Sequence, residues 1–171
     1  MSTAGASVSL VPLDRQHVTR TREWANDPTV SRLMNRARPV TEAEHDAWFE
    51  AIRGRDDCVY FAVERMVEPR HVGNVWLWDI DSRHRKAELR VVIGEPSVRG
   101  LGLGTDAINA VCRHGFGRLN LHRIYAYVLS INPGGRRAFE KAGFVLEGTL
   151  QADRWTGDRF VDTWLLARIE H

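Results

Sequence analysis

Cysteine is scarce in this sequence, and its scarcity excludes one class of protein. Cys58 and Cys112 are the only two thiols, and they lie far apart, without the spacing of a disulfide framework. Small secreted domains held together by disulfides carry more cysteines at closer spacing. The seven histidines likewise lack the spacing of metal ligands. We therefore predict a protein without structural disulfides and without a bound metal.

Neither a strong charge of one sign nor a long apolar run is present. The formal net charge of +2 at pH 7 is too small for the basic surface of a typical nucleic-acid-binding protein. No stretch approaches the length of a membrane span, and residues 1–13 lack the basic and apolar regions of a signal peptide. The sequence therefore predicts a cytoplasmic protein with no nucleic-acid or membrane partner.

The length and composition of the chain fit one globular domain. The chain has 171 residues, enough to bury a core, and its hydrophobic fraction of 43% and charged fraction of 27% are ordinary for a soluble protein. Six tryptophans are many for this length, and several need a role beyond packing. Repeats and long linkers are absent, so we predict a single domain over residues 1–171.

The hydrophobic period changes along the chain from helical to alternating and back. Apolar and turn residues predict strands at residues 9–12, 59–67, 72–80, 87–93, 123–129, 145–152 and 159–169. Helical spacing and end signals predict helices from Asp14 to about Asn26, from the capping box at Thr41, over 104–119, and over 136–142 before Gly143. This order predicts a mixed sheet with helices on its faces.

A glycine-rich segment lies between the strand at 87–93 and the helix that follows. It consists of Arg99, Gly100, Leu101, Gly102, Leu103, Gly104 and Thr105. Glycines bring backbone N–H groups close to an anion, and a helix N-terminus adds unpaired amides and a positive dipole end, so the segment predicts a phosphate site. It lacks the Gly-Lys-Ser/Thr ending of a nucleotide-triphosphatase loop and the Gly-x-Gly-x-x-Gly spacing of a dinucleotide site. The alternative is a turn that only joins strand to helix.

The loop belongs to a longer pattern that continues with a helix, a strand, Asn132 and the run RRAFEKAGF at 136–144. This pattern resembles the GNAT superfamily of N-acetyltransferases. The flanking segments EWAND at 23–27, the helix at 41–49 and the hairpin at 147–162 resemble the branch with ribosomal-protein alanine, spermidine and amino-sugar acetyltransferases. The resemblance implies an α/β (α+β) fold: a mixed, mostly antiparallel sheet of about seven strands, splayed at the cofactor cleft, with about four helices.

The resemblance also implies acetyl-CoA as co-substrate and assigns residues to it. The amides of residues 101–105, together with Arg99, would hold the pyrophosphate. The open edge of the strand at Val92 and Ile93 would hydrogen-bond the amide-rich pantetheine arm, which suits backbone groups that lack a neighbouring strand. Asn132 and Arg136 would contact the coenzyme beyond the second strand.

Acetylation of an amine requires a neutral amine, whereas a free alkyl ammonium titrates near ~10.4. We therefore expect a base, and Glu88 is the first candidate because its strand would line the thioester. The alternative is that Glu88 is only an exposed cross-strand partner of an arginine such as Arg90. The amide of Val92 would meet the oxyanion of the tetrahedral intermediate. Weaker candidates for the base, in the adjoining turn, are Asp79, Asp81 and His84.

The resembling family often places a tyrosine in the helix after Asn132 to protonate the leaving thiolate. Phe139 occupies that position here. The role then passes to another group or to none, since a thiolate with a reference pKa near ~8.5 leaves without a proton. The candidates are water, Tyr125, Tyr127 and Ser130.

Tryptophans gather in the segments that would surround the acceptor. Trp24, Trp76 and Trp78 are the predicted acceptor-binding residues, with Trp48 beside them. Aromatic walls suit a sugar ring or an apolar side chain, although each tryptophan could instead fill the core. No markedly acidic segment for a polyamine is evident. Five arginines could meet a nucleotide-linked amino sugar or form a solvated basic face, namely Arg20, Arg22, Arg32, Arg36 and Arg38.

Together these features predict an acetyl-CoA-dependent N-acetyltransferase with a small-molecule amine or a protein N-terminus as partner. The acceptor would be a small amine, an amino sugar or a protein N-terminal residue, attacking the thioester directly through a tetrahedral intermediate. An antibiotic-modifying acetyltransferase of the same fold and a non-catalytic acyl-CoA-binding module are the alternatives. The sequence leaves room for a homodimer.

Overall fold

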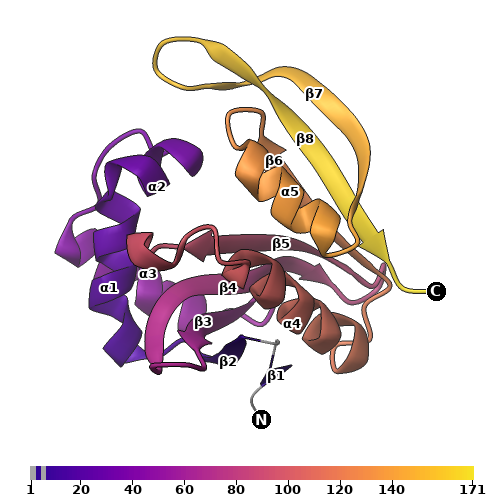
Figure 1. Ribbon diagram of the computed structural model, residues 1–171, viewed down its shortest axis with the longest axis horizontal. Helices are drawn as coiled ribbons and strands as arrows, with labels where there is room; N and C mark the ends of the chain where they lie inside the picture. Colours follow the sequence, from indigo (N-terminus) through magenta and orange to yellow (C-terminus); the bar gives the residue numbers. More distant parts are fainter. Residues whose placement is uncertain (1–2, 5–6) are drawn as a thin grey trace.

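The computed structural model describes residues 3–4 and 7–171, and its described strands form one eight-stranded sheet (Figure 1). The order across the sheet is β1-β2-β3-β4-β5-β6-β8-β7. The strands span Thr3–Ala4 (β1), Val8–Pro12 (β2), Val59–Arg65 (β3), Arg70–Asp81 (β4), Lys86–Ile93 (β5), Arg123–Leu129 (β6), Val145–Trp155 (β7) and Phe160–Ile169 (β8). All neighbours are antiparallel except β5 and β6.

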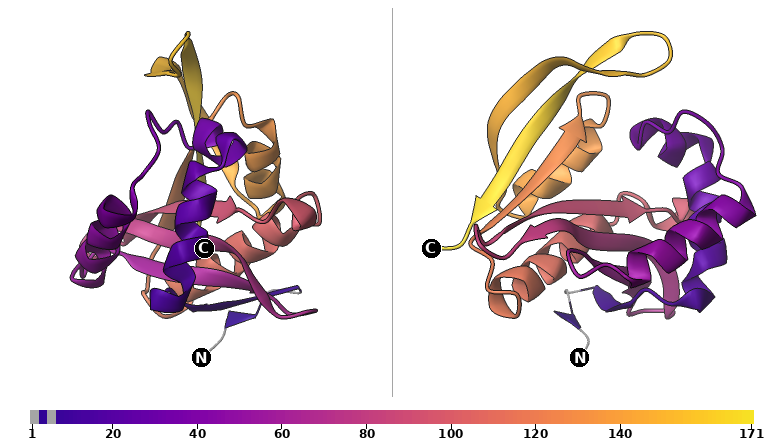
Figure 2. Two further views of the ribbon diagram at one scale, coloured as in Figure 1. Left: turned by 90° about the vertical axis from the view of Figure 1, so that its left-hand side faces the viewer. Right: turned by 180° about the vertical axis from the view of Figure 1, so that it is seen from behind.

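The parallel pair β5–β6 opens after three residues. The last paired residues are Glu88 and Tyr125, and β5 then continues to Ile93 without β6 beside it. Figures 1 and 2 show the result: β6, β8 and β7 rise away from the rest of the sheet. The divergence confirms the splay that the resemblance implies.

Five α-helices and one 3₁₀ turn accompany the described strands. They span Arg15–Asn26 (α1), Pro28–Leu33 (α2), Glu42–Arg53 (α3), Leu103–Gly117 (α4), Pro133–Lys141 (α5) and, for the 3₁₀ turn, Pro96–Val98. The helix α4 covers one face of the sheet, where its Ile108 and Val111 share the main core with Val75 and Leu77 of β4. On the other face, α1 and α3 enclose a smaller core around Phe49.

Strand alternation divides the residues of β4 between these two faces. Val75 and Leu77 are fully buried against α4. Trp76 and Trp78 alternate with them, and Trp78 packs against the smaller core beside α1 and α3. The aromatic residues of this strand are therefore directed to the side that the helices of the first third of the chain cover.

The helix starts differ in how their first amides are satisfied. Side chains cap α1, α2, α3 and α5, with capping boxes at Asp14 and Thr41 and single caps at Asp27 and Asn132. The helix α4 instead begins at Gly102, which has no side chain to offer. A helix whose first amides have no capping side chain retains unpaired donors at that end.

The predicted mixed, mostly antiparallel sheet with helices on its faces is confirmed. Two elements add to the expectation: the two-residue strand β1, and α2, because Asp27 both ends α1 and caps the next helix. The fourth predicted helix begins at Pro133 rather than near Arg136, and the glycine after it, Gly143, has a φ of +85°.

Candidate active site

The glycine segment forms an open, left-handed turn at the start of α4. Gly100 and Gly102 have φ values of +78° and +80°, which side-chain-bearing residues rarely adopt. A Cβ at either position would meet no atom within 4 Å, so the backbone there faces open space. The first helical hydrogen bond runs from the amide of Asp106 to the carbonyl of Gly102. The amides before Asp106 are thus without helical hydrogen bonds, the arrangement by which a helix N-terminus can bind an anion through its backbone.

Arg99 lies at the base of this turn and contacts the end of β5. Its guanidinium donates to the carbonyl of Gly94 at 3.0 Å and to that of Ile93 at 3.4 Å. It also lies 3.9 Å from the carboxylate of Asp27. Arg99 therefore fixes the glycine turn to β5, and its contact with pyrophosphate stays a prediction.

Gly94, which follows β5, lies directly against the indole of Trp24. A Cβ on Gly94 would overlap three atoms of that ring. The amide of Gly94 donates to Val72 at 3.0 Å, so the backbone is held in place. The glycine is required here because the turn that leads to α4 and the indole of α1 are in contact.

The exposed edge of β5 follows the last β5–β6 pair. Val92 and Ile93 pair with Asn74 and Gly73 of β4, and no β6 residue pairs with them. Their strand therefore leaves backbone groups open on the β6 side. This geometry fits the predicted site for the pantetheine arm, and the role stays a prediction.

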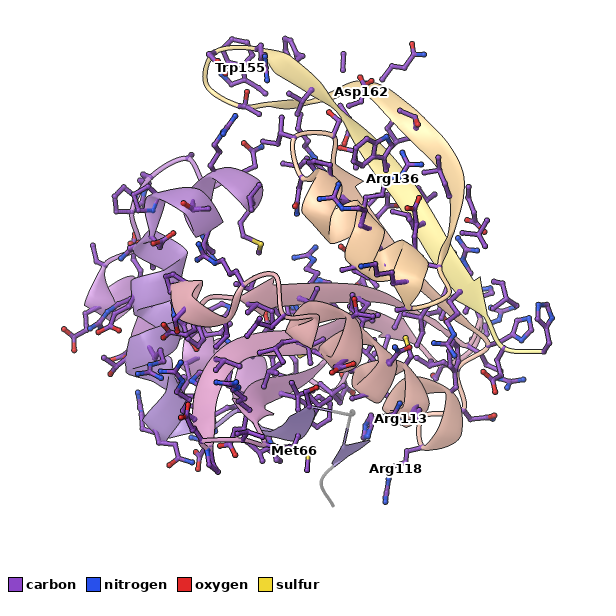
Figure 3. All side chains as sticks on the ribbon, viewed as in Figure 1. Met66, Arg113, Arg118, Arg136, Trp155 and Asp162 are labelled. Carbon is purple, nitrogen blue, oxygen red and sulfur yellow. The ribbon has the colours of Figure 1, made fainter. Side chains whose placement is uncertain are left out.

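Asn132 and Arg136 already have partners within the protein. The Asn132 side chain accepts from the amide of Gly135 at 2.9 Å and so caps α5. Arg136 donates to Glu140 at 2.8 Å and lies over the ring of Trp164, 4.7 Å from its centroid. Figure 3 shows Arg136 on α5 near the raised part of the sheet. Both residues have structural roles, and their contact with the coenzyme stays a prediction.

Glu88 is the last β5 residue with a β6 partner. It is only 9% exposed, and its carboxylate accepts from Arg90 at 2.8 and 3.2 Å. Its strand neighbours on the same face are Trp78 of β4 and Tyr125 of β6. The arginine partner foreseen as the alternative is present, but it lies on the same strand and the pair is partly buried. Burial, and next the charge of Glu88, raise the pKa of Tyr125.

The weaker candidates for the base lie in two places. Asp81 and His84 pair with each other in the β4–β5 turn, whereas the charge of Asp79, near the end of β4, acts on Arg90 and Tyr125 beside Glu88. Asp81 accepts from the amide and the ring of His84, at 2.8 and 2.7 Å. The hydrogen bonds from His84 lower the pKa of Asp81. His84 and Asp79 are exposed. The pairing of Asp81 with His84 is that of an ordinary solvated turn.

Four tryptophans meet around one cavity of about 250 Å³. Trp24 comes from α1, Trp48 from α3, and Trp76 and Trp78 from β4. Tyr60 of β3 stacks on Trp76, with ring centroids 4.7 Å apart and an interplanar angle of 12°. The structure brings together the predicted acceptor residues, and we call this cavity the aromatic pocket. Its other lining residues include Val30, Met34, Arg36, Val40, His45, Asn74, Arg90 and Val92.

The polar groups of the aromatic pocket were not predicted. His45 Nδ1 and Trp76 Nε1 are buried and have no hydrogen-bond partner among the described residues. Burial, followed by the charges of Arg22 and Arg36, lowers the pKa of His45. Burial also raises the pKa of Tyr60. No sequence signal separates His45 or Tyr60 from core aromatics, because only the fold places them beside β4.

A second cavity of about 560 Å³ adjoins the aromatic pocket through Arg36, which lines both. It lies between the α2 region and the turn of the β7–β8 hairpin, and we call it the basic cleft (Figure 1). Its charged lining residues are Arg32, Arg36, Arg38, Asp158 and Arg159. Two of the five arginines noted in the sequence lie elsewhere: Arg20 donates to the carbonyl of His71, and Arg22 pairs with Glu42.

Comparison with known proteins decides the family. A family model described as an acetyltransferase (GNAT) domain matches residues 7–145. The chain belongs to the GNAT acetyltransferase family. The spermidine N(1)-acetyltransferase of Escherichia coli strain K12 is 27% identical over 169 residues, covering 96% of this chain and 87% of that protein. An N-acetyltransferase 9-like protein of Nematostella vectensis is 28% identical over 151 residues, covering 82% and 75%.

A solved structure agrees with this assignment. The spermidine N-acetyltransferase of Vibrio cholerae, crystallised with CoA and spermine, superimposes with a TM-score of 0.87 at 26% identity, covering 95% of each chain. This GNAT acetyltransferase is therefore an N-acetyltransferase, and its family uses acetyl-CoA. The turn at Gly100 and Gly102, with its open backbone amides, fits the pyrophosphate of that coenzyme.

The structure of this GNAT acetyltransferase explains why Phe139 occupies the position where the family often has a tyrosine. Phe139 is 4% exposed and packs against Phe144, with ring centroids 5.0 Å apart. It anchors α5 in the main core. Tyr127 is 46% exposed and forms an edge contact with Tyr125. The identity of a general acid stays open among the groups named from the sequence.

Within residues 3–4 and 7–171, no group of three or more His, Cys, Asp or Glu side chains is placed to hold a metal ion. Over the same residues, no helix is long and apolar enough to cross a membrane.

Proposed function

We propose that this enzyme transfers the acetyl group of acetyl-CoA to a primary amine bound in the aromatic pocket. The acceptor is a small amine, an amino sugar or a protein N-terminal residue. One observation carries the proposal: the strand β5 leads from Glu88 past Arg90 to Val92, which lines the pocket, and then to the turn before α4. A single strand thus joins a buried carboxylate, an aromatic pocket and an anion-binding turn.

In this proposal the backbone of the protein holds the coenzyme. The amides of residues 101–105 bind the pyrophosphate, with the positive end of the α4 dipole behind them. Arg99 keeps the turn in place through the carbonyls of Ile93 and Gly94. The open edge of β5 at Val92 and Ile93 hydrogen-bonds the pantetheine amides.

Glu88 is the proposed base. Glu88 takes a proton from the ammonium, directly or through water, and the neutral nitrogen then forms a bond to the thioester carbon. The carbon–sulfur bond breaks, coenzyme A leaves as a thiolate, and the second proton lost by the nitrogen neutralises that thiolate through water. Arg90 holds the carboxylate in a fixed position through two hydrogen bonds. The amide of Val92 is the proposed donor to the oxyanion.

Relatives support transfer to an amine without naming the acceptor of this chain. The proteins from E. coli and V. cholerae are named as spermidine acetyltransferases, and a human relative is named as an α/β-tubulin N-acetyltransferase. A V. cholerae structure is described as dodecameric, which supports a homo-oligomer, such as the expected dimer, for this chain. The free thiols of Cys58 and Cys112 support a reducing, cytoplasmic compartment.

A thiol-release assay tests the proposal. Acetyl-CoA is offered with amino sugars, polyamines, aminoglycosides, amino acids and peptides with varied N-termini, and a reaction without amine measures background hydrolysis. We expect amine-dependent release of CoA and an acetylated product of the matching mass. Tight binding of acetyl-CoA without release above background for any amine would contradict the proposal.

A further inference from the structure

The aromatic pocket offers hydrogen-bond donors and positive charge to its occupant. Trp76 Nε1 is buried without a partner, and an indole N–H can only donate. Arg36 and Arg90 line the same cavity, and a guanidinium also only donates. His45 Nδ1, the other unpartnered buried atom, belongs to a ring whose neutral form burial favours. An occupant that fits this pocket must therefore bring acceptor atoms.

Negative charge is scarce around the pocket. No aspartate or glutamate is among the residues that line it. The carboxylate next along this face of β5 is that of Glu88, and Arg90 already occupies both of its oxygens. Of the two arginines that line the pocket, Arg90 is thus offset by Glu88 and by the charge of Asp79, whereas Arg36 has no ion-pair partner within the described part of the chain.

The basic cleft extends the same charge outward from Arg36. Arg32 and Arg159, on opposite sides of the cleft, also have no ion-pair partner among the residues that the structure describes. Arg38 differs, because it makes two hydrogen bonds to Glu44, at 3.1 and 2.6 Å. Asp158 is the one carboxylate among the residues lining the cleft, and it accepts from Thr156. Two connected cavities thus share a net positive field.

We infer that the acceptor is a primary amine that also carries an anionic oxygen group, a carboxylate or a phosphate, and that Arg36 selects it. This inference rests on the proposed function and specifies its substrate class. The apolar part of the acceptor lies among the tryptophans, and the anionic group lies at Arg36, which lines both cavities.

A polyamine does not suit this site. Its protonated nitrogens are all donors, and the guanidinium groups of Arg36 and Arg90 in the lining are donors too, so neither side offers the other a hydrogen-bond acceptor. Its charges would also face Arg36 without a carboxylate in the lining to offset them. The names of the spermidine-acetylating relatives therefore do not transfer to this chain.

Matched pairs of amines test the inference. Tyramine is compared with tyrosine for the carboxylate, glucosamine with glucosamine 6-phosphate for the phosphate, and spermidine serves as the polyamine. In the thiol-release assay with the wild-type protein, we expect kcat/KM at least about tenfold higher for the anionic member of one pair, mostly through KM, and spermidine below both members. The pair that shows the preference identifies the anionic group.

Variants assign the preference to Arg36. In Arg36→Gln the ratio of kcat/KM within the preferred pair should fall toward one, a loss of roughly tenfold to hundredfold, the range for one hydrogen bond to a charged group. Arg83→Gln removes the same charge from the exposed β4–β5 turn and should leave the ratio unchanged. Circular dichroism and thermal melting confirm that both variants are folded.

The outcomes are distinguishable. Equal rates within both pairs, or a preference for spermidine, would overturn the inference while the proposed function stands. An undiminished ratio in Arg36→Gln would overturn the role of Arg36. If no amine of the wider panel releases CoA, the proposed function fails and the inference fails with it.

Discussion

The anion-binding turn and the aromatic pocket are neighbours at β5, yet they are built by different means. The turn is a short continuous segment whose binding groups are backbone amides, freed by glycines at positive φ. The pocket is made of side chains from α1, α2, α3, β3, β4 and β5. A backbone site depends on local conformation, whereas a side-chain site depends on the whole fold. The two should therefore fail separately when each is altered.

The largest effect should come from Glu88→Gln. The substitution keeps the shape of the side chain but removes its basicity, so kcat should fall by about 10²–10⁴, the usual contribution of general base catalysis. Titration calorimetry with acetyl-CoA should give an unchanged Kd, because the turn before α4 is untouched. The control is Glu147→Gln, which alters an exposed glutamate that is also paired with an arginine, Arg123, at 2.7 and 2.6 Å. An unchanged kcat in Glu88→Gln would remove Glu88 from the role of base.

Gly102→Val should produce the opposite pattern. A β-branched residue at a φ of +80° is strained, and its Cβ would project into the open space over the turn. We expect acetyl-CoA to bind roughly fivefold to thirtyfold more weakly. Gly117→Val, at the other end of α4 where a Cβ meets nothing within 4 Å, serves as the control. Tight binding by Gly102→Val would show that the coenzyme does not use this turn.

Trp76→Phe sharpens the comparison within the pocket. Phenylalanine keeps an aromatic ring against Tyr60 but removes the indole N–H that has no partner, together with one of the two fused rings. The KM of the acceptor should rise by roughly threefold to tenfold, the value of one neutral hydrogen bond, while the KM of acetyl-CoA stays constant. Equal changes in both constants would mean that the two sites are not separate.

The smallest effect should be a dependence of stability on pH. Burial lowers the pKa of His71, which contacts Trp24, from its ordinary 6.5 to about 4. Between pH 6.5 and 4 the unfolded chain therefore binds more protons than the folded one, so stability is full above pH 6.5 and declines as the pH falls.

In His71→Gln, the fall in Tm between pH 7 and pH 5 should be smaller by about 2–4 °C, the shift that about 1 kcal/mol gives in a chain of this length. Calorimetric scans of both proteins at the two pH values measure it. An identical fall in the variant would show that His71 does not titrate in this range.

The parts of the molecule that depend on nearby residues were predictable from the sequence. Seven of the eight strands, the capping box at Thr41 and the glycine turn each rest on residues within a few positions of one another. The sequence also predicted which face of β4 is aromatic, because Trp76 and Trp78 alternate with Val75 and Leu77. The helix α2 was missed because Asn-Asp-Pro signals the end of one helix and the start of the next equally well.

The parts that depend on distant residues were not predictable. Tyr60 lies 16 positions from its stacking partner Trp76, and only the β3–β4 register places the two rings together. The guanidinium of Arg99 could equally have faced the open turn, and the fold directs it to the carbonyls of β5. The sharing of Arg36 by two cavities likewise follows from how α2 and the β7–β8 hairpin are arranged.

If the proposed sites are correct, the close contact of Gly94 with Trp24 gives the two substrates a common boundary. On one side lies the backbone that Arg99 joins to the glycine turn, and on the other lies Trp24, a wall of the aromatic pocket. No atom fits between them, so a displacement of this boundary enters both binding constants. Thermodynamic linkage then requires the coupling to be reciprocal. If bound coenzyme changes the affinity for the acceptor by some factor, bound acceptor changes the affinity for the coenzyme by the same factor.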